Sequence, residues 1–452
     1  MRPMRLRTLA ATAVLALGLT GPATAQTTLD AAGLRALAVS EMARGNLAQA
    51  ETMARALLAH DPRDATALTL AAEGAVARGD WAGAQELARR AHARVEGPAR
   101  FRMARIMAFA LAKQGRFTQA QFWLRRAEPD APDPHAATGL ARDYRMVASQ
   151  NPLSFRLGLN VAPSSNVNSG SRARTLTLPG LPFEFELSGD ARALSGLAVT
   201  GSVELGYDLP PLPTGPVRLD FRAMGRTYRL SDSARAQAPE ARGRDFAQAV
   251  LGFGANHRLL RGGAPPIDIS AELARTWYGG EPYLDTLRLG ASRGVALDAG
   301  RRLELSLGLE RVERRDITAD WWMPSVGAVL RQRVGDDRLD LTARLRDLRS
   351  DRPDTGHESV ALGADYSFGQ SFGPARLGLG VEGEWRDYDA SRYAMGGRED
   401  RSLRLDARIG LPDLGRYGFY PEVGLSAERV WSQVDLFDEE TLTLDLGLRS
   451  AF

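Results

Sequence analysis

The chain has 452 residues, of which 25% are charged, and its formal net charge is only +3. This length allows two or three domains. So small a net charge gives no sign of the broad basic surface that binds nucleic acid. The sequence contains no cysteine, which excludes a disulfide framework and a thiolate metal site. We therefore expect no nucleic-acid partner and no disulfide-stapled fold.

Residues 1–25 have the pattern of a secretory signal peptide. Arginines precede an apolar run over 9–19, and small residues follow at 23–25. The run is too short for a spanning helix and is followed by a cleavage-type sequence. Beyond it, no stretch reaches the roughly 20 apolar residues that a transmembrane helix needs. We expect an exported chain that can enter a membrane only through strands.

Residues 29–150 carry a helical repeat. Three similar hexapeptides, GNLAQA, GDWAGA and GRFTQA, are spaced 34 and 36 residues apart and begin at Gly45, Gly79 and Gly115. Pro62 and Pro132 each follow the last residue of a hexapeptide by twelve residues. This pattern resembles the tetratricopeptide repeat, whose helix pairs turn at a small residue and end near a proline. We expect helix pairs and a capping helix over 133–149; a plain array of hairpins without a binding role is the alternative.

From residue 154 onward the hydrophobic period changes to two. Leucine occupies every second position from 303 to 309, and similar alternation recurs over 197–207 and 403–409. The segments number about fourteen, and an even number of amphipathic strands in an exported chain is typical of an outer-membrane barrel. The strands of a soluble sandwich are shorter. We expect a multidomain α + β protein, with a tetratricopeptide-repeat α-solenoid over 29–150 and a transmembrane antiparallel β-barrel over 154–452.

The connections between the predicted strands differ in length at the two ends of the barrel. The short connections include 210–215, 298–300 and 335–336, and the long ones are 163–194, 231–243 and 389–397. Short periplasmic turns and long external loops are the usual asymmetry. We therefore expect a protein of the outer membrane whose N-terminal domain lies in the periplasm. Tryptophans that we expect to form a girdle at the outer strand ends are Trp277, Trp321, Trp322, Trp385 and Trp431.

The C-terminal stretch 441–452 alternates leucine with polar or small residues and ends in phenylalanine. We expect it to be the last strand, which pairs with the first strand and closes the barrel. Asp445, Gly447 and Phe452 also resemble the insertion signal that the barrel-assembly machinery of the outer membrane reads. Ser450 departs from that signal, which usually has an apolar or aromatic residue at this position. The resemblance implies that this machinery is a partner during insertion.

Charged side chains recur on the polar face of the predicted strands, which in a membrane barrel faces the lumen. Those that we expect to face the lumen are Arg218, Asp220, Arg222, Arg344, Arg346, Glu382, Glu384, Arg386, Arg404, Asp406 and Arg408. Two interpretations are open. The charges pair across the lumen and fill it, or they line a hydrated passage of mixed charge.

The sequence offers little chemistry of its own. It contains no HExxH motif, phosphate-binding loop or cysteine–histidine metal motif. Of its five histidines, His257 and His357 fall in the predicted barrel, and nothing in the sequence brings either of them to a nucleophile and an acid. We expect no catalytic residues, no cofactor and no metal site, and hence a protein that is not an enzyme.

A short motif, Ala162–Asn168, follows the first predicted strand. With the repeats before it and the barrel around it, this motif resembles the surface lipoprotein assembly modifier (Slam) family, which joins periplasmic tetratricopeptide repeats to an outer-membrane barrel. The matching motif residues are Ser165, Asn166 and Asn168; asparagine is also an ordinary turn residue. The resemblance implies a translocator that helps deliver lipoproteins or related secreted proteins from the periplasm to the cell surface. Its partners are then a client protein and outer-membrane lipid.

Two other functions fit the same order of parts. Exopolysaccharide exporters also place a tetratricopeptide scaffold before a barrel, but their scaffold is usually much longer and their barrel larger, which favours the protein translocator. A passive porin with an accessory periplasmic domain is the third candidate, although porins do not usually need a repeat array. The sequence leaves open the client, the exact strand number, the oligomeric state, and whether export uses the lumen or a lateral seam.

Removal of Phe452 tests the interpretation of the C-terminal strand. The truncated protein should reach the outer membrane at several-fold lower levels, because both the assembly signal and the closing strand lose their terminal aromatic residue. Immunoblots of outer-membrane fractions measure the level, and pulse labelling controls for synthesis. Normal outer-membrane levels of the truncated protein would contradict this interpretation.

Overall fold

A computed structural model describes residues 30–177, 183–317 and 319–450. The chain divides after Arg94 into two compact units, and each unit is described by itself. The predicted signal peptide, residues 1–25, lies outside the described residues. In the described part of the chain, no helix is both long enough and apolar enough to cross a membrane.

Residues 30–94 form two helix hairpins, made of α1 (Ala31–Ala43), α2 (Leu47–His60), α3 (Ala65–Ala77) and α4 (Trp81–His92). Asp30, Asp64 and Asp80 precede three of these helices, and each accepts a hydrogen bond from a backbone amide of the first turn. These caps satisfy donors that a helix leaves free at its start. Gly45 and Gly79 make the turns within the hairpins with φ of +84° and +73°, a conformation that favours glycine.

Small residues let the helices of the first unit pack closely. Ala50 and Ala84, which end two of the repeat hexapeptides, are both fully buried. The carboxylate of Glu51 is also buried, and ion pairs with Arg55 and Arg78 compensate it. A buried charge without such partners would be strongly destabilising.

The second unit begins with a further hairpin and one more helix, formed by α5 (Gly97–Lys113), α6 (Phe117–Ala127), the short 3₁₀-helix η1 (Glu128–Asp130) and α7 (Pro134–Ala148). Gly115 makes the turn with φ of +74°, and Ala120 is fully buried. The hairpin therefore repeats the local design of the first unit. Helix α7 coincides with the capping helix predicted over 133–149. Membership of the tetratricopeptide family and the domain limits 29–150 and 154–452 stay predictions.

Helix α6 and the adjoining η1 contact the barrel at two places. Asn151, which leads into the first strand, donates hydrogen bonds to Thr118 and Gln121 of α6 at 3.1 and 2.7 Å. Arg125 donates to the carbonyl oxygen of Gly418 at 3.1 Å and lies over the ring of Phe419. The carboxylate of Glu128 accepts a hydrogen bond from the amide of Tyr417 at 2.9 Å. These seven residues together with Asn151 are called the α6 brace.

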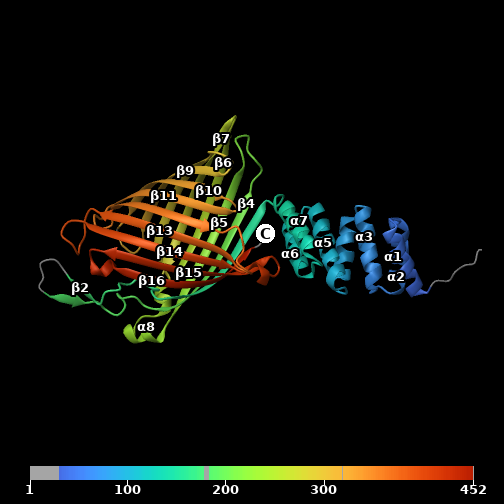
Figure 1. The fold of residues 1–452 in the computed structure, drawn as a ribbon, viewed down its shortest axis with the longest axis horizontal. Coiled ribbons are helices and arrows are strands. Elements are labelled where there is room, and N and C mark those ends of the chain that lie inside the picture. The colour runs from blue at the N-terminus through green and yellow to red at the C-terminus, as the bar shows by residue number, and fades with distance from the viewer. Residues whose placement is uncertain (1–29, 178–182, 318, 451–452) are drawn as a thin grey trace, which may run out of the picture. The chain divides into compact units, whose positions relative to one another are not determined.

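The rest of the second unit is a closed antiparallel barrel (Figure 1). Its strands are β1 (Leu153–Ser164), β4 (Gly196–Asp208), β5 (Val217–Leu230), β6 (Gln248–Arg261), β7 (Ala264–Tyr278), β8 (Glu281–Ala296), β9 (Arg301–Arg314), β10 (Trp321–Val334), β11 (Asp337–Ser350), β12 (His357–Ser367), β13 (Arg376–Tyr388), β14 (Arg398–Gly410), β15 (Phe419–Ser432) and β16 (Glu439–Ser450). In the described residues the barrel thus has fourteen strands, which confirms the predicted number. The closure is made by β1, which pairs with both β4 and β16.

The two ends of the barrel are named by what adjoins them. At the helical end, α7 leads into β1; at the opposite, loop end lie the predicted long connections. The first of these, residues 165–195, contains a separate hairpin of β2 (Thr175–Thr177) and β3 (Glu184–Glu186). The second, residues 231–247, contains α8 (Asp232–Gln237) and η2 (Gly243–Phe246). The difference in length between the ends is a tendency: the loop-end turn Gly279–Gly280 is short, and the helical-end connections 209–216, 368–375 and 411–418 have eight residues each.

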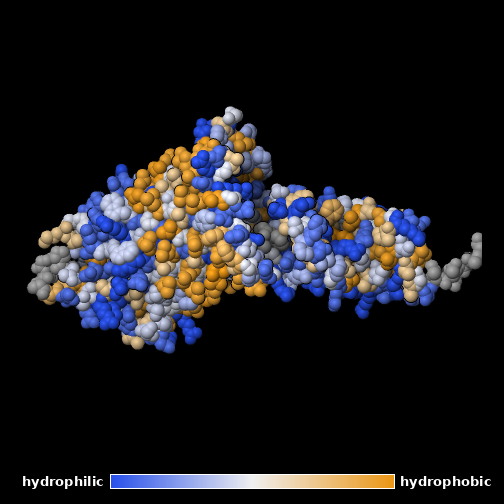
Figure 2. Space-filling model, viewed as in Figure 1, coloured by the Kyte–Doolittle hydropathy of each residue, from blue (hydrophilic) through white to orange (hydrophobic). Residues whose placement is uncertain are grey.

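The outer face of the barrel is apolar. Figure 2 shows hydrophobic residues gathered over the barrel strands. Exposed leucines occupy alternate positions of several strands, for example Leu305 with Leu307, and Leu442 through Leu448 in β16. Because every second side chain of a strand points to the same face, the predicted alternation has become a surface suited to lipid.

Closure predicts how the protein behaves in detergent. A barrel whose strands pair in a ring has no free sheet edge over most of its circumference, so it should stay folded in dodecyl sulfate at room temperature. The unheated protein should migrate faster on a gel than the boiled protein, and it should fractionate with outer membranes. A protein recovered in the soluble fraction, with the same mobility before and after boiling, would contradict this fold.

Candidate functional site in the barrel interior and at its closing seam

The barrel interior is polar, and described residues line two cavities in it. Cross-strand register aligns Asp365, Gly380 and Asp406 on neighbouring strands, and all three line a cavity of about 600 Å³. A second cavity of about 600 Å³ lies toward the loop end. Asn160 and Asp445 line both of them, so the two cavities adjoin along the inside of the wall.

All the charged residues predicted for the lumen take part in ion pairs along the wall. Arg222 of β5 lies 2.5 Å from Glu272 of β7, and Arg408 of β14 lies 2.6 Å from Asp365 of β12. Within single strands, Arg218 pairs with Asp220 and Arg404 with Asp406, at 2.9 and 3.1 Å. The remaining predicted charges pair as Arg344–Glu382, Arg346–Glu384 and Arg386–Glu384. Each pair thus joins the same strand or strands two apart, and none of these pairs spans the lumen.

Small residues on intervening strands make the longer pairs possible. On β6, Gly252 stands opposite Arg222, where a Cβ would come within 2.9 Å of the Arg222 guanidinium, and Gly254 stands opposite Glu272. Strand β12 lies between Arg346 of β11 and Glu384 of β13, and its small residue Ser359 stands directly opposite Arg346. The arginines therefore lie flat against the wall. Of the two interpretations of these charges, this arrangement favours a wall of mixed charge that leaves space in the interior.

The asparagine motif fixes the first loop. Asn166 is only 6% exposed; its side chain donates a hydrogen bond to the carbonyl oxygen of Gly170 and accepts one from the Gly170 amide, both at 2.9 Å. The Asn168 side chain donates to the carbonyl oxygens of Asp190 and Arg192 and accepts from the amide of Leu194 at 2.9 Å. The two amide groups thus replace backbone pairing in a segment without regular structure.

The same loop is joined to the last strand. The amide of Ser165 donates to the carbonyl oxygen of Leu442 at 3.0 Å, and the Ser165 hydroxyl accepts from the Leu442 amide at 2.8 Å. The buried hydroxyl of Ser171 donates to a carbonyl oxygen of η4 (Asp435–Phe437). Arg172 pairs with Glu440 at 3.0 Å. Ser165, Ser171 and Arg172, with their partners, are called the seam latch.

The closing seam itself is unequally paired. On its other edge, β1 pairs with β4 over its whole length, from Leu153 opposite Tyr207 to Ser164 opposite Gly196. Against β16, the described residues pair only at Asn160, Val161 and Ser164, opposite Gly447, Leu446 and Thr443. Strand β16 nevertheless continues to Ser450 and pairs with β15 up to that residue. Toward the helical end, the described parts of β1 and β16 therefore run without a ladder between them.

The predicted assembly-signal residues lie beside this seam. Gly447 is the last residue of β16 that pairs with β1 toward the helical end, and Asp445 lines the interior cavities. Phe452 lies outside the described residues. The pairing of the first and last strands is confirmed, and the role of these residues as an insertion signal stays a prediction.

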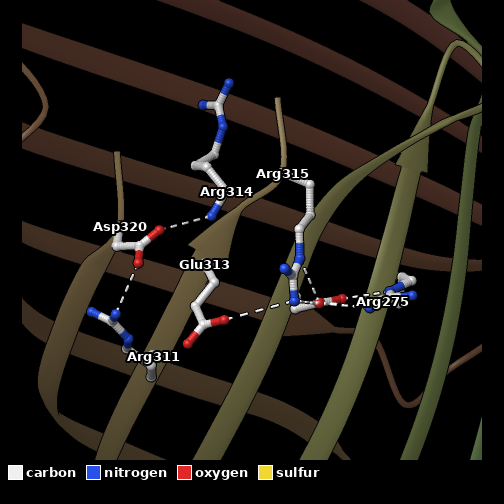
Figure 3. A network of polar contacts seen from close by, with 7 residues as sticks. Arg275, Arg311, Glu313, Arg314, Arg315 and Asp320 are labelled. Carbon is white, nitrogen blue, oxygen red and sulfur yellow. Dashed lines mark hydrogen bonds and ion pairs between the residues drawn. The ribbon is translucent and has the colours of Figure 1, made fainter. Parts of the chain in front are cut away.

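A charged cluster on the outer face escaped sequence reasoning (Figure 3). Asp285 of β8 pairs with Arg275 at 2.6 Å and with Arg315, and Arg311 pairs with Asp320 at 2.9 Å. In the ladder between β7 and β8, Arg275 stands opposite Asp285, and the lumen residues Glu272 and Arg288 also stand opposite each other. Arg275 and Asp285 are each an odd number of positions away from these lumen residues, so their side chains point to the outer face. The signal was present in β7, where outward positions change from leucine to arginine and then tryptophan near the strand end.

This cluster lies at the level of the tryptophans. Arg311 is 5.2 Å from the ring centroid of Trp322. The five tryptophans predicted for a girdle lie at loop-end strand termini, at positions 277, 321, 322, 385 and 431. Outward charges are costly at the centre of a bilayer and tolerated at its surface, so the cluster marks the loop-end limit of the apolar band. In the adjoining loop, the Arg314 guanidinium lowers the pKa of Asp316.

The two barrel histidines make ordinary local contacts. His257 lies 3.2 Å from the Thr214 hydroxyl and 3.1 Å from the carbonyl oxygen of Pro216. His357 lies 3.0 Å from the carbonyl oxygen of Thr355 and stacks on Tyr388. Among the described residues, no group of three or more histidine and acidic side chains could hold a metal ion.

Comparisons with known proteins identify no relative by sequence: no family model and no curated protein matches. Solved structures that match part of this chain include the KdgM porin (15% identity, 46% of this chain, 94% of that chain, TM-score 0.27). Another is Pseudomonas aeruginosa OccK3 (OpdO), with 14% identity over 65% of this chain and 94% of that chain and a TM-score of 0.32. A third is a bacterial polysaccharide outer membrane secretin, with 12% identity over 65% of this chain and 98% of that chain and a TM-score of 0.33. At these scores the likenesses carry no argument about function.

The class of the protein follows from its own geometry. Only helices and closed barrels satisfy all backbone polar groups within lipid, and this barrel combines closure with an apolar outer face and a polar interior. The protein is an outer-membrane β-barrel. In this chain, helix hairpins precede the barrel.

The motif asparagines should hold the first loop against proteolysis. Asn166→Ala removes both hydrogen bonds to Gly170 in a buried site, at a cost of about 1–3 kcal/mol. Trypsin should then cut the folded, detergent-solubilised protein faster at Arg172 and Arg174, which mass spectrometry can measure. Glu186→Gln, an exposed change in β3 of the same loop, is the control. Equal cleavage rates for both variants would show that the asparagines do not organise the loop.

Proposed function

We propose that the protein is a translocator that delivers a polypeptide client, a lipoprotein or a related secreted protein, from the periplasm to the cell surface. The observation that carries this proposal is the α6 brace, which fixes a helix hairpin to the end of the barrel where β1 begins. A porin needs no such attachment. A helix hairpin held at the entrance of a barrel can hold a client and hand it on.

The proposal orients the barrel. Turns at the helical end include the short connections 298–300 and 335–336, and the long loop with the seam latch lies at the other end. Outer-membrane barrels usually have short turns on the periplasmic side. The helices then lie in the periplasm, and the asparagine motif lies at the cell surface.

Exposed apolar side chains on the helices suit a polypeptide client. Phe122 of α6 is 57% exposed and stands two positions from the buried Ala120 and Leu124, which places it on the opposite side of the helix. Phe109 of α5 and Met146 of α7 are also exposed. Large aromatic and methionine side chains are typical of surfaces that bind other chains, so these residues are the proposed contacts for the client.

The size of the interior limits the form of the client. A folded domain of 100 residues has a radius of gyration of about 13 Å, and neither of the two adjoining cavities, of about 600 Å³ each, has room for such a domain. The proposed client passes as an extended chain. An extended chain is also the form that helix arrays and strand edges bind.

Polysaccharide export is the second candidate, and one observation favours it. Tyr228, Tyr278 and Tyr283 line the loop-end cavity together with charged side chains, and the rings of Tyr278 and Tyr283 lie 5.6 Å apart. Aromatic rings beside charged groups can also bind acidic sugars. The two candidates differ in what disappears from the cell surface when the gene is deleted.

Display of lipoproteins tests the proposal. Protease shaving of intact cells, followed by mass spectrometry, should reveal at least one lipoprotein that loses its surface exposure when the gene is deleted and regains it on complementation. Phe122→Asp should lower that exposure by about tenfold, because a charge disfavours apolar contact. Leu212→Asp, which alters an exposed residue of a barrel turn, is the control. Loss of a surface polysaccharide with unchanged lipoproteins would refute the proposal.

A further inference from the structure

The described halves of β1 and β16 near the helical end leave a gap in the ring of backbone pairing. If their ladder continued beyond Asn160 and Gly447, Leu159 would stand opposite Leu448 and Gly158 opposite Arg449. Leu159 and Gly158 lie in β1, and Leu448 and Arg449 lie in β16, but no backbone pairing joins them across the seam. Their leucine side chains are among the most exposed in the barrel, 67% for Leu159 and 70% for Leu448.

Polar side chains along the gap are held away from it. Arg156 pairs with Glu204 on β4, on the far side of β1. Arg449 pairs with Glu422 on β15 at 2.8 Å, on the far side of β16. Gly158 has no side chain. The side chains thus leave the two backbone edges facing each other without an ionic clasp between them.

The loop half of the same seam is held closed. There the backbone pairs at Asn160, Val161 and Ser164 are followed by the seam latch, in which Ser165 exchanges two hydrogen bonds with Leu442. The asparagine motif stiffens the loop that carries this latch. The seam can therefore part at the helical end while it stays closed at the loop end.

The α6 brace holds both sides of this gap. Asn151 connects α6 to the start of β1, on one side. Arg125 and Glu128 connect the same helix segment to Tyr417–Phe419, where β15 begins beside β16, on the other. A shift of α6 would therefore change the separation of the two strands, and α6 also carries the exposed Phe122.

We propose that the helical half of the β1–β16 seam is a docking site for an extended strand of the client, which pairs with the unpaired edges and enters the lumen there. The inference rests on the proposed function, since it names where the client enters. Unpaired backbone groups are costly in lipid, and only another extended backbone offers donors and acceptors in the matching alternation. Outward leucines and a polar interior face select a strand of alternating apolar and polar residues.

Disulfides test this site in a chain that has no cysteine of its own. Leu159→Cys with Leu448→Cys would lock the gap. Two control pairs use registered partners on the outer face: Val161→Cys with Leu446→Cys in the closed half of the seam, and Leu157→Cys with Val203→Cys across β1 and β4. Oxidation should lower display of the lipoprotein identified above at least tenfold in the first variant and less than twofold in both controls. Reduction should restore it.

The outcomes separate the site from the function. Undiminished display by the oxidised Leu159–Leu448 variant, with its disulfide verified, would overturn the docking site and leave the translocator standing. Equal loss in the Val161–Leu446 control would overturn the division of the seam into open and closed halves. If the intact protein displays no lipoprotein, the proposed function itself fails. Disulfide-linked homodimers of the single Leu159→Cys variant would assign the free edge to a second copy of this chain instead.

A readout without any client uses a water-soluble maleimide on the full-length protein in liposomes. The Leu159→Cys variant should react at least tenfold faster than the Leu205→Cys variant, whose residue lies on the outer face of the fully paired β4. Arg125→Ala should increase the rate at position 159 further, because it releases one side of the α6 brace. Equal rates at positions 159 and 205 would mean that lipid seals the seam, and would overturn the docking site.

Discussion

The need to pair every backbone polar group within lipid governs this structure. It explains why the chain changes from a helical to a two-residue period, why the strands form a ring, and why β16 pairs with β1. The helices have no such constraint. They depend instead on buried alanines, which recur at Ala50, Ala84 and Ala120, and on glycines in the turns between helices. In the helical half of the seam, β1 and β16 do not pair with each other, so this requirement is not met there. This half of the seam adjoins the helix hairpin.

The interior follows a second rule, that charges brought into a protein must be paired. Small residues such as Gly252 and Ser359 let arginines cross a strand and reach acids two strands away. This keeps long side chains against the wall and leaves the adjoining cavities open. Since each pair is still partly exposed, its contribution to stability is modest. The network therefore matters more for the shape and polarity of the interior than for the stability of the barrel.

Periodicity predicted the strands well because it is local. The alternation noted over 197–207, 303–309 and 403–409 falls within β4, β9 and β14, because alternation is a pattern of adjacent positions. The hydrogen bonds of Asn166 and Asn168 were not predictable, because their partners lie in a loop without a period. The outward pair Arg275–Asp285 and the contacts of Arg125 depend on which segments become neighbours. The unpaired half of the seam was also invisible, because β1 and β16 both have the pattern of complete strands.

Hydrogen exchange of the full-length protein in lipid nanodiscs tests the central claim most directly, which is that the ring closes at the loop end of the seam and is open at the helical end. The measured quantity is the protection of individual backbone amides that do not bond to β4 or β15. The account predicts rapid exchange in Leu157–Leu159 and Leu448–Ser450 and strong protection among Asn160, Val161 and Ser164, within the same two strands. Uniform protection along β1 and β16 would show a fully zipped barrel and would contradict it.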